Sequence, residues 1–121
     1  MKISKANAPH YIWGDRCDGW HLVQQPELSV IHERMPPHTA EVRHYHEQAR
    51  QLFFVLTGTA ELEVDGELHT LGPQEGCEVP PGVPHQMKNV SSGDVEFLVV
   101  SHPQTRGDRV EAPPLAEPKR D

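Results

Sequence analysis

The chain has 121 residues, a length typical of one domain. Its 18 acidic and 11 basic residues give a net charge of −7, which argues against a nucleic-acid groove or an anionic membrane face, because both need clustered cations. No apolar run approaches the ~18 residues that span a bilayer, and neither a disulfide scaffold nor an export signal is evident. We therefore expect a cytoplasmic protein, whose 9 Gly and 12 Pro residues imply many turns.

The N-terminal part is predicted to be an arm that packs on the main body. Residues 1–22 begin polar and then become rich in large apolar side chains, and Trp13 and Trp20 carry enough apolar surface to fasten such an arm. We assign the main body to residues 23–103 and a C-terminal extension to residues 104–121. The proline-rich tail from about residue 112 is predicted to be disordered.

Short β-type runs separated by turn residues fill the main body. Asp65-Gly66 predicts a two-residue type I′ hairpin, because Gly accepts a positive φ without steric cost. Such a turn places Leu68 on the opposite face from Leu62, so either the turn is longer or that strand is exposed. No segment has a convincing 3.6-residue period, which favours an all-β barrel or sandwich. The predicted strands are 28–35, 41–46, 51–57, 60–64, 67–71, 76–79, 85–90 and 95–101.

The sharpest local signal is His44-Tyr45-His46. Residues two apart on a strand point to the same face, so both imidazoles could bind one cation, although two solvated surface histidines would have the same pattern. A proline-rich turn over residues 80–84 delivers His85 to a later strand, where it could serve as a third ligand.

At these positions the sequence resembles the cupin superfamily. The first cupin motif places H-x-H before an acidic ligand and a Gly, and the second places P-x-G before a His and an Asn. The positions that fit are His44, His46, Gln51 and Gly58 in the first motif, and Pro80, Gly82, His85 and Asn89 in the second. The sequence departs from the motifs at His38 and Gln74, where each would open with Gly, and at Gln51, where the family has Glu.

The resemblance implies a double-stranded β-helix, or jelly-roll barrel, with one divalent transition metal (Fe, Mn, Ni, Cu or Zn). The implied ligands are His44, His46, Gln51 and His85, with Gln48 or Glu47 as alternatives to Gln51. A pocket around the metal would be lined by Phe53, Val55, Met87 and Asn89. Domains of this kind commonly dimerise, so a homodimer is expected.

Three neutral imidazoles and a neutral amide would leave a divalent ion with its full charge, which favours a small anionic or chelating substrate. Cupins with such sites include dioxygenases and enzymes that isomerise or ketonise sugar acids. Enolisation needs a positioned base, and the expected ligands include no carboxylate. A dioxygenase is therefore the leading hypothesis, with an isomerising or ketonising enzyme and a non-catalytic small-molecule-binding cupin as alternatives.

The partners expected from the sequence are a small molecule and a second copy of the chain, with no nucleic acid and no membrane. The loop Arg-Gly-Asp-Arg at residues 106–109 is interpreted as a surface feature.

Overall fold

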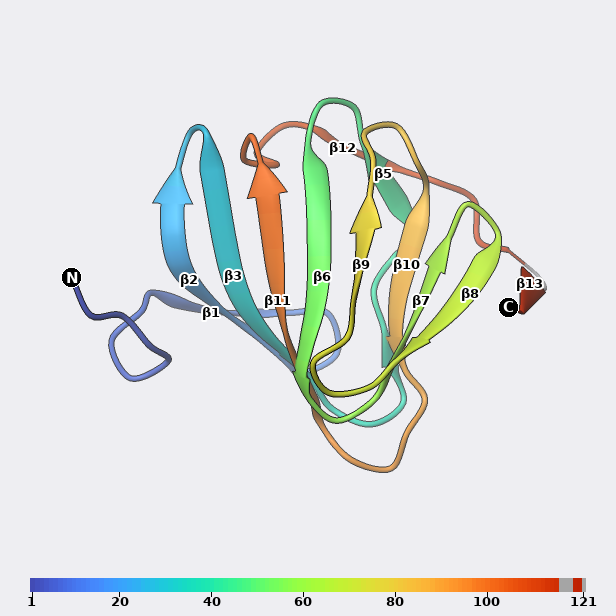
Figure 1. Ribbon diagram of the computed structural model, residues 1–121, viewed down its shortest axis with the longest axis horizontal. Helices are drawn as coiled ribbons and strands as arrows, with labels where there is room; N and C mark the ends of the chain where they lie inside the picture. Colours follow the sequence, from blue (N-terminus) through green and yellow to red (C-terminus); the bar gives the residue numbers. More distant parts are fainter. Residues whose placement is uncertain (116–118, 121) are drawn as a thin grey trace.

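The computed structural model describes residues 1–115, 119 and 120. They form two β-sheets that meet at one end and diverge towards the other, as Figure 1 shows. Among these residues, no helix is long and apolar enough to cross a membrane. The all-β prediction is confirmed.

The first sheet has six antiparallel strands in the order β1-β2-β3-β11-β6-β9. Along β11, buried Val95, Phe97 and Val99 alternate with more exposed residues, and this alternation directs one face of the sheet into the core. The strands are β1 (His10–Trp13), β2 (Cys17–Gln25), β3 (Leu28–Met35), β6 (Arg50–Thr57), β9 (Gly76–Val79) and β11 (Val95–His102).

The second sheet has the order β12-β5-β10-β7-β8-β13, and β4 also pairs with β10. All its pairs are antiparallel except β8 with β13. Leu62 and Met87 from its inner face pack against the first sheet in one apolar core. The strands are β4 (Thr39–Ala40), β5 (His44–His46), β7 (Ala60–Val64), β8 (Glu67–Leu71), β10 (His85–Asn89), β12 (Arg109–Glu111) and β13 (Lys119–Arg120).

Most predicted strands coincide with observed ones, but the strand predicted at 41–46 is shorter: only 44–46 form a strand, β5, and the short strand β4 lies before the predicted run. Regular pairing stops at Glu41, the residue after β4, whose backbone N–H donates to the Met87 carbonyl at 3.0 Å. The Glu41 carboxylate in turn accepts a hydrogen bond from the Met87 backbone N–H at 2.8 Å. This side-chain acceptor replaces part of the regular ladder and directs the following chain towards the two histidines of β5.

The Asp65-Gly66 turn is the predicted two-residue hairpin, with φ values of 50° and 91° and Val64 paired with Glu67. Leu68 lies on the outer face, where it is only 5% exposed, beside its strand partner Glu63. The Glu63 carboxylate accepts hydrogen bonds from Arg43 Nε and Nη2 at 2.7 and 3.0 Å. A buried ion pair therefore flanks Leu68 on this face.

At the N-terminus, β1 and β2 extend the first sheet, so residue 22, the predicted end of the arm, falls inside β2. At the C-terminus, the Ala112 N–H donates to the Arg43 carbonyl at 2.9 Å, and Arg43 Nη1 donates to the Pro113 carbonyl at 3.0 Å. The predicted disordered tail covers 112–121, of which 116–118 and 121 lie outside the described residues. The division into arm, body and extension stays a prediction.

Candidate metal centre

Three histidines lie together on the inner face of the second sheet. His44 and His46 are two apart on β5, and His85 of β10 is the direct strand partner of His44. One ring nitrogen from each of them lies within 4.8 Å of the others, and their exposed fractions are 4%, 6% and 1%. This cluster could hold a metal ion.

Hydrogen bonds fix two of the three rings. His44 Nδ1 donates to the Val42 carbonyl at 2.7 Å, and His85 Nδ1 donates to the Val83 carbonyl at 3.0 Å. Each ring therefore presents Nε2 as the nitrogen that carries a lone pair, the arrangement in which metal-binding histidines are usually held. Within the described part of the chain, His85 Nε2 and His46 Nδ1 are buried and have no hydrogen-bond partner.

All three imidazoles are neutral near pH 7. Burial lowers the pKa of His44 to about 3. Burial and the neighbouring His85 lower the pKa of His46 to about 4, and burial also lowers that of His85. Metal ions bind the neutral form of imidazole, so the cluster fits a divalent transition metal without first losing protons.

Gln51 enters the same cavity from β6 of the first sheet and is 5% exposed. Its Nε2 donates to Ser101 Oγ at 3.0 Å, which leaves the buried Oε1 without a partner among the described residues. A free amide oxygen suits a fourth ligand, but its coordination of a metal stays a prediction.

The predicted pocket residues are all buried, and they occupy different places. Phe53 lines the cavity, with its ring centre 5.5 Å from that of His85. Val55 and Met87 belong to the apolar core. Asn89 binds the backbone: its Nδ2 donates to the carbonyls of Met35 and Gly93 at 2.9 and 2.8 Å.

The cavity beside the histidines has a volume of about 210 Å³ and adjoins a second cavity of about 300 Å³. Residues that line both are Tyr11, Glu33, Glu41 and Arg109. None of these four was expected from the sequence to be a site residue. Glu33 could have been found from the sequence, because it is an acidic residue at one of the alternate positions of β3 that face the core. Tyr11 and Arg109 could not, since their positions depend on how β1 and β12 pair.

Burial changes the acidity of the two carboxyl groups. It raises the pKa of Glu33 to about 8, with a contribution from the neighbouring Glu41. It raises the pKa of Glu41 to about 7. The Glu41 carboxylate also lies 3.9 Å from His44 Nδ1, so acidic side chains stand directly beside the histidine cluster.

Tyr11 reaches Glu33 because residue 19 is a glycine. Tyr11 of β1 is the strand partner of Gly19 of β2, and its hydroxyl donates to Glu33 Oε2 at 3.2 Å. A Cβ atom at Gly19 would lie 2.2 Å from Tyr11 Cζ, so only glycine lets the ring lie across β2. Burial and Glu33 raise the pKa of Tyr11, which keeps its hydroxyl protonated.

The chain is similar in sequence or in fold to several known proteins. Polyketide synthase CurC of Streptomyces cyaneus is 34% identical over 59 residues, which are 49% of this chain and 37% of that protein. The chain thus spans little more than a third of the length of this relative.

Solved structures that share the fold include two enzymes. The polyketide cyclase RemF from Streptomyces resistomycificus superimposes with a TM-score of 0.81 at 18% identity, covering 98% of this chain and 89% of RemF. A sugar phosphate isomerase of the cupin superfamily from Silicibacter pomeroyi gives 0.78 at 19% identity, covering 98% and 96%. The cupin domain family model matches residues 31–101, which is more than half of the chain. The chain therefore belongs to the cupin domain family.

Proposed function

We propose that the protein is a metal-dependent enzyme that moves a proton within a small anionic or chelating carbonyl compound. The observation that carries this proposal is the position of Glu33, which lines the same cavity as His44 and His46 and is hydrogen-bonded to Tyr11. The sequence favoured a dioxygenase because the expected ligands offered no base. With Glu33 beside those ligands, an isomerising or ketonising reaction has the base that it needs.

The proposed reaction assigns metal binding and proton transfer to different residues. His44, His46, His85 and, as we propose, Gln51 would hold a divalent ion, which acts when bound as a Lewis acid that polarises a carbonyl oxygen. Glu33 accepts a proton from the carbon next to the carbonyl and returns it to another atom of the same molecule. The C–H bond that breaks is matched by the bond to hydrogen that forms, and no oxidant is consumed.

The surroundings of Glu33 suit that role. With its pKa raised to about 8, both its protonated and its ionised form are accessible near neutral pH. The Tyr11 hydroxyl holds one carboxylate oxygen and so sets the direction of the other. Phe53 and Val99 give the cavity part of an apolar wall. A polyketide cyclase and a sugar phosphate isomerase have the same fold, so this fold accommodates an isomerase.

Proton transfer can be tested without knowing the natural substrate. Metal-reconstituted protein is incubated in D₂O with a panel of 2-oxo acids and sugar acids, and deuterium uptake next to the carbonyl is followed by NMR. Wild-type protein should exchange at least one compound, and Glu33→Gln should slow that exchange by roughly 10²- to 10⁴-fold. Glu78→Gln, which removes an exposed carboxylate on β9, is the matched control and should exchange at the wild-type rate.

The dioxygenase hypothesis is retained as a second candidate because the three imidazoles and the amide of Gln51 are all neutral donors that suit redox-active metals. It predicts substrate-dependent oxygen uptake by iron- or copper-reconstituted protein, with no deuterium exchange that depends on Glu33. A non-catalytic binding cupin would show neither activity while still binding a compound from the panel.

We propose that the protein forms a homodimer through the outer face of the first sheet. Leu52 is 39% exposed there, and its partner Val100 and the neighbouring pair Phe54 and Leu98 are only half-buried. A second copy would cover this apolar surface. Light scattering should give about twice 13.6 kDa, and Leu52→Glu should lower it. A monomeric mass at micromolar concentration would contradict the proposal.

The cytoplasmic location stays a prediction from the sequence.

A further inference from the structure

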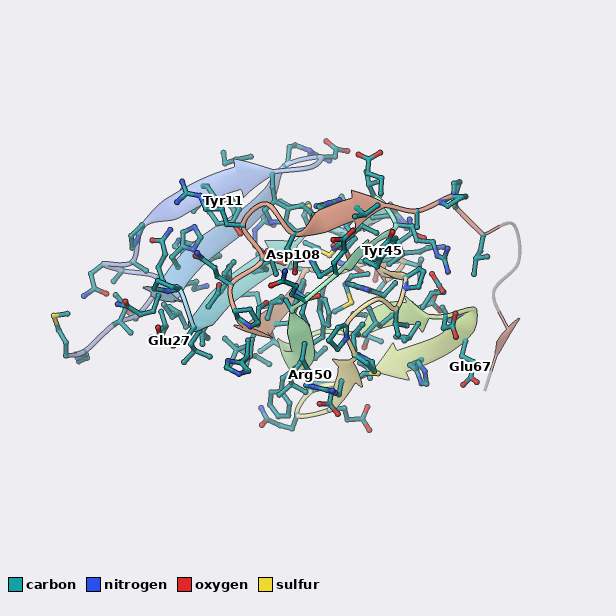
Figure 2. All side chains as sticks on the ribbon, turned by 90° about the horizontal axis from the view of Figure 1, so that it is seen from above. Tyr11, Glu27, Tyr45, Arg50, Glu67 and Asp108 are labelled. Carbon is teal, nitrogen blue, oxygen red and sulfur yellow. The ribbon has the colours of Figure 1, made fainter. Side chains whose placement is uncertain are left out.

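The segment that follows β11 crosses one end of the barrel before it joins β12, as Figure 1 shows at the top of the molecule. Asp108 fastens its far end. The Asp108 carboxylate accepts hydrogen bonds from the backbone N–H groups of Gln48 at 3.0 and 3.2 Å and of Ala49 at 2.9 Å. The Glu47 N–H also donates to the Asp108 carbonyl at 3.2 Å. Seen from above, Asp108 lies near the centre of the molecule, in Figure 2.

This attachment fixes the register of the next residue. β12 pairs with β5 so that Arg109 lies directly opposite His46. Paired residues of antiparallel strands project from the same face, with Cβ atoms about 4.5–5.5 Å apart. Arg109 therefore faces the cavity together with His46, and it lines the cavity with Glu33 and Glu41.

The Arg109 guanidinium keeps most of its hydrogen-bonding capacity. It donates to the Val42 carbonyl at 3.3 Å through Nη2, and within residues 1–115 no carboxylate lies within ion-pair distance of it. A guanidinium offers a fork of donors that matches the two oxygens of a carboxylate. Glu33 and Glu41 line the same cavity, and burial raises the pKa of these carboxyls to about 8 and about 7, so neither carries a full negative charge at neutral pH.

We propose that Arg109 determines specificity by binding the carboxylate of the substrate, while the oxygen next to that carboxylate lies at the histidine cluster. The substrate class is a small carboxylic acid with a carbonyl or hydroxyl group beside the carboxylate. The assignment of a reacting oxygen at the histidines rests on the proposed function, whereas anion binding by Arg109 does not. The segment that carries Arg109 is preorganised, because the hydrogen bonds of Asp108 order its backbone before any ligand binds.

The same loop contains a matched control. Arg106 lies three residues earlier and lines a different cavity, with His21 and Ser29. Replacing Arg106 or Arg109 with Met removes the same charge from the same loop, so a general electrostatic effect would appear in both variants. A specific contact would appear only at Arg109.

The test uses zinc-loaded protein, oxalate as the anionic probe and oxamide as its uncharged isostere, with binding measured by calorimetry. Arg109→Met should weaken oxalate binding by about tenfold or more, the loss expected for one charge-assisted contact, and change oxamide binding by less than about twofold. Arg109→Lys should recover part of the affinity, since it restores the charge without the fork. Arg106→Met should bind both probes as wild type does, and zinc content and circular dichroism verify each variant.

The assignment would be overturned if wild-type protein does not bind oxalate or if Arg109→Met binds oxalate with unchanged affinity. It would also be overturned if Arg109→Met loses as much affinity for oxamide as for oxalate, or if Arg106→Met loses as much oxalate affinity as Arg109→Met does. Failure of the proposed function has a different signature. If wild-type protein exchanges no deuterium but its oxalate binding depends on Arg109, the proton-transfer reaction is wrong and the anion site stands. If Glu33→Gln abolishes exchange while Arg109→Met leaves oxalate binding intact, the proton-transfer reaction stands and the assignment of Arg109 as the anion site is wrong.

Discussion

Gly19→Ala should raise the pKa of Glu33, although Glu33 itself is not substituted. The added Cβ would lie 2.2 Å from Tyr11 Cζ and 2.5 Å from the Tyr11 hydroxyl oxygen. The ring would have to retreat by about 1.2 Å to reach ordinary contact at 3.4 Å. The bond from the Tyr11 hydroxyl to Glu33 Oε2 is already 3.2 Å long, so this movement breaks it.

The size of the effect follows from the lost hydrogen bond. A bond to a charged group contributes roughly 1.5–3 kcal/mol, and one pKa unit corresponds to about 1.4 kcal/mol. The bond to Tyr11 stabilises the ionised form of Glu33, so its loss should raise the pKa of Glu33 from about 8. Because the bond is long, we expect a rise near the lower limit, about one pKa unit.

The assay is a carboxyl ¹³C NMR titration of metal-free protein labelled at glutamate, with Glu33→Gln used to assign the resonance. Tyr11→Phe should raise the pKa of Glu33 by a similar amount, and the double variant should add nothing further. Gly93→Ala is the control, since a Cβ at Gly93 meets open space. If the pKa of Glu33 stays unchanged in both Gly19→Ala and Tyr11→Phe, then Tyr11 does not hold Glu33.

Three further predictions concern metal and pH. Wild-type protein should contain about one first-row divalent metal per chain, and elemental analysis should show that His44→Ala loses most of it; unchanged occupancy would refute the site. Gln51→Glu should raise metal affinity in competitive chelation and weaken oxalate binding, because a carboxylate is a stronger donor and lowers the residual charge of the ion; if neither changes, Gln51 is not a ligand. Glu33 binds its proton more tightly in the folded than in the unfolded state, so its contribution to the unfolding free energy should fall as pH rises from about 4.5 to about 8. The three histidines, whose pKa values are lowered, contribute a rise below about pH 6.5, so the contribution of Glu33 is measured as a difference between variants. In urea titrations the unfolding free energy of wild-type protein minus that of Glu33→Gln should fall over this pH range, and identical pH profiles would mean that the pKa of Glu33 is not raised in the folded state.

Local patterns predicted most of the barrel and the histidine cluster. Alternation and turn residues located β3, β7, β8 and β9 at their observed bounds, because strand polarity and glycine turns are encoded within a few neighbouring residues. The H-x-H spacing predicted that His44 and His46 share a face, and they do. The two-residue hairpin at Asp65-Gly66 was also predicted correctly. The burial of Leu68 was not predicted, since the ion pair beside it brings Arg43 from the segment between β4 and β5.

The positions of Tyr11 and Arg109 in the cavity were beyond local patterns, whereas Glu33 had a signal in the alternation of β3. A tyrosine near the N-terminus becomes a site residue only when β1 pairs with β2 and Gly19 clears the path for its ring. An arginine in a polar loop becomes one only when Asp108 sets the register of β12. Both depend on pairing between segments that no short-range period reveals. The expected ligand set therefore could not show that carboxyl groups line the same cavity as the histidines.

The origin of each site residue suggests how specificity is built. The histidines and Gln51 lie inside residues 31–101, the stretch that matches the cupin domain family, whereas Tyr11 and Arg109 lie outside it. The matched stretch contains the metal-binding potential on strands whose inward faces also form the core. The flanking segments add strands at the edges of the two sheets, where they can change without disturbing that core. On this division, exchanging β1 or the 104–109 loop should alter which substrate binds and how its proton moves, while leaving the histidine cluster in place.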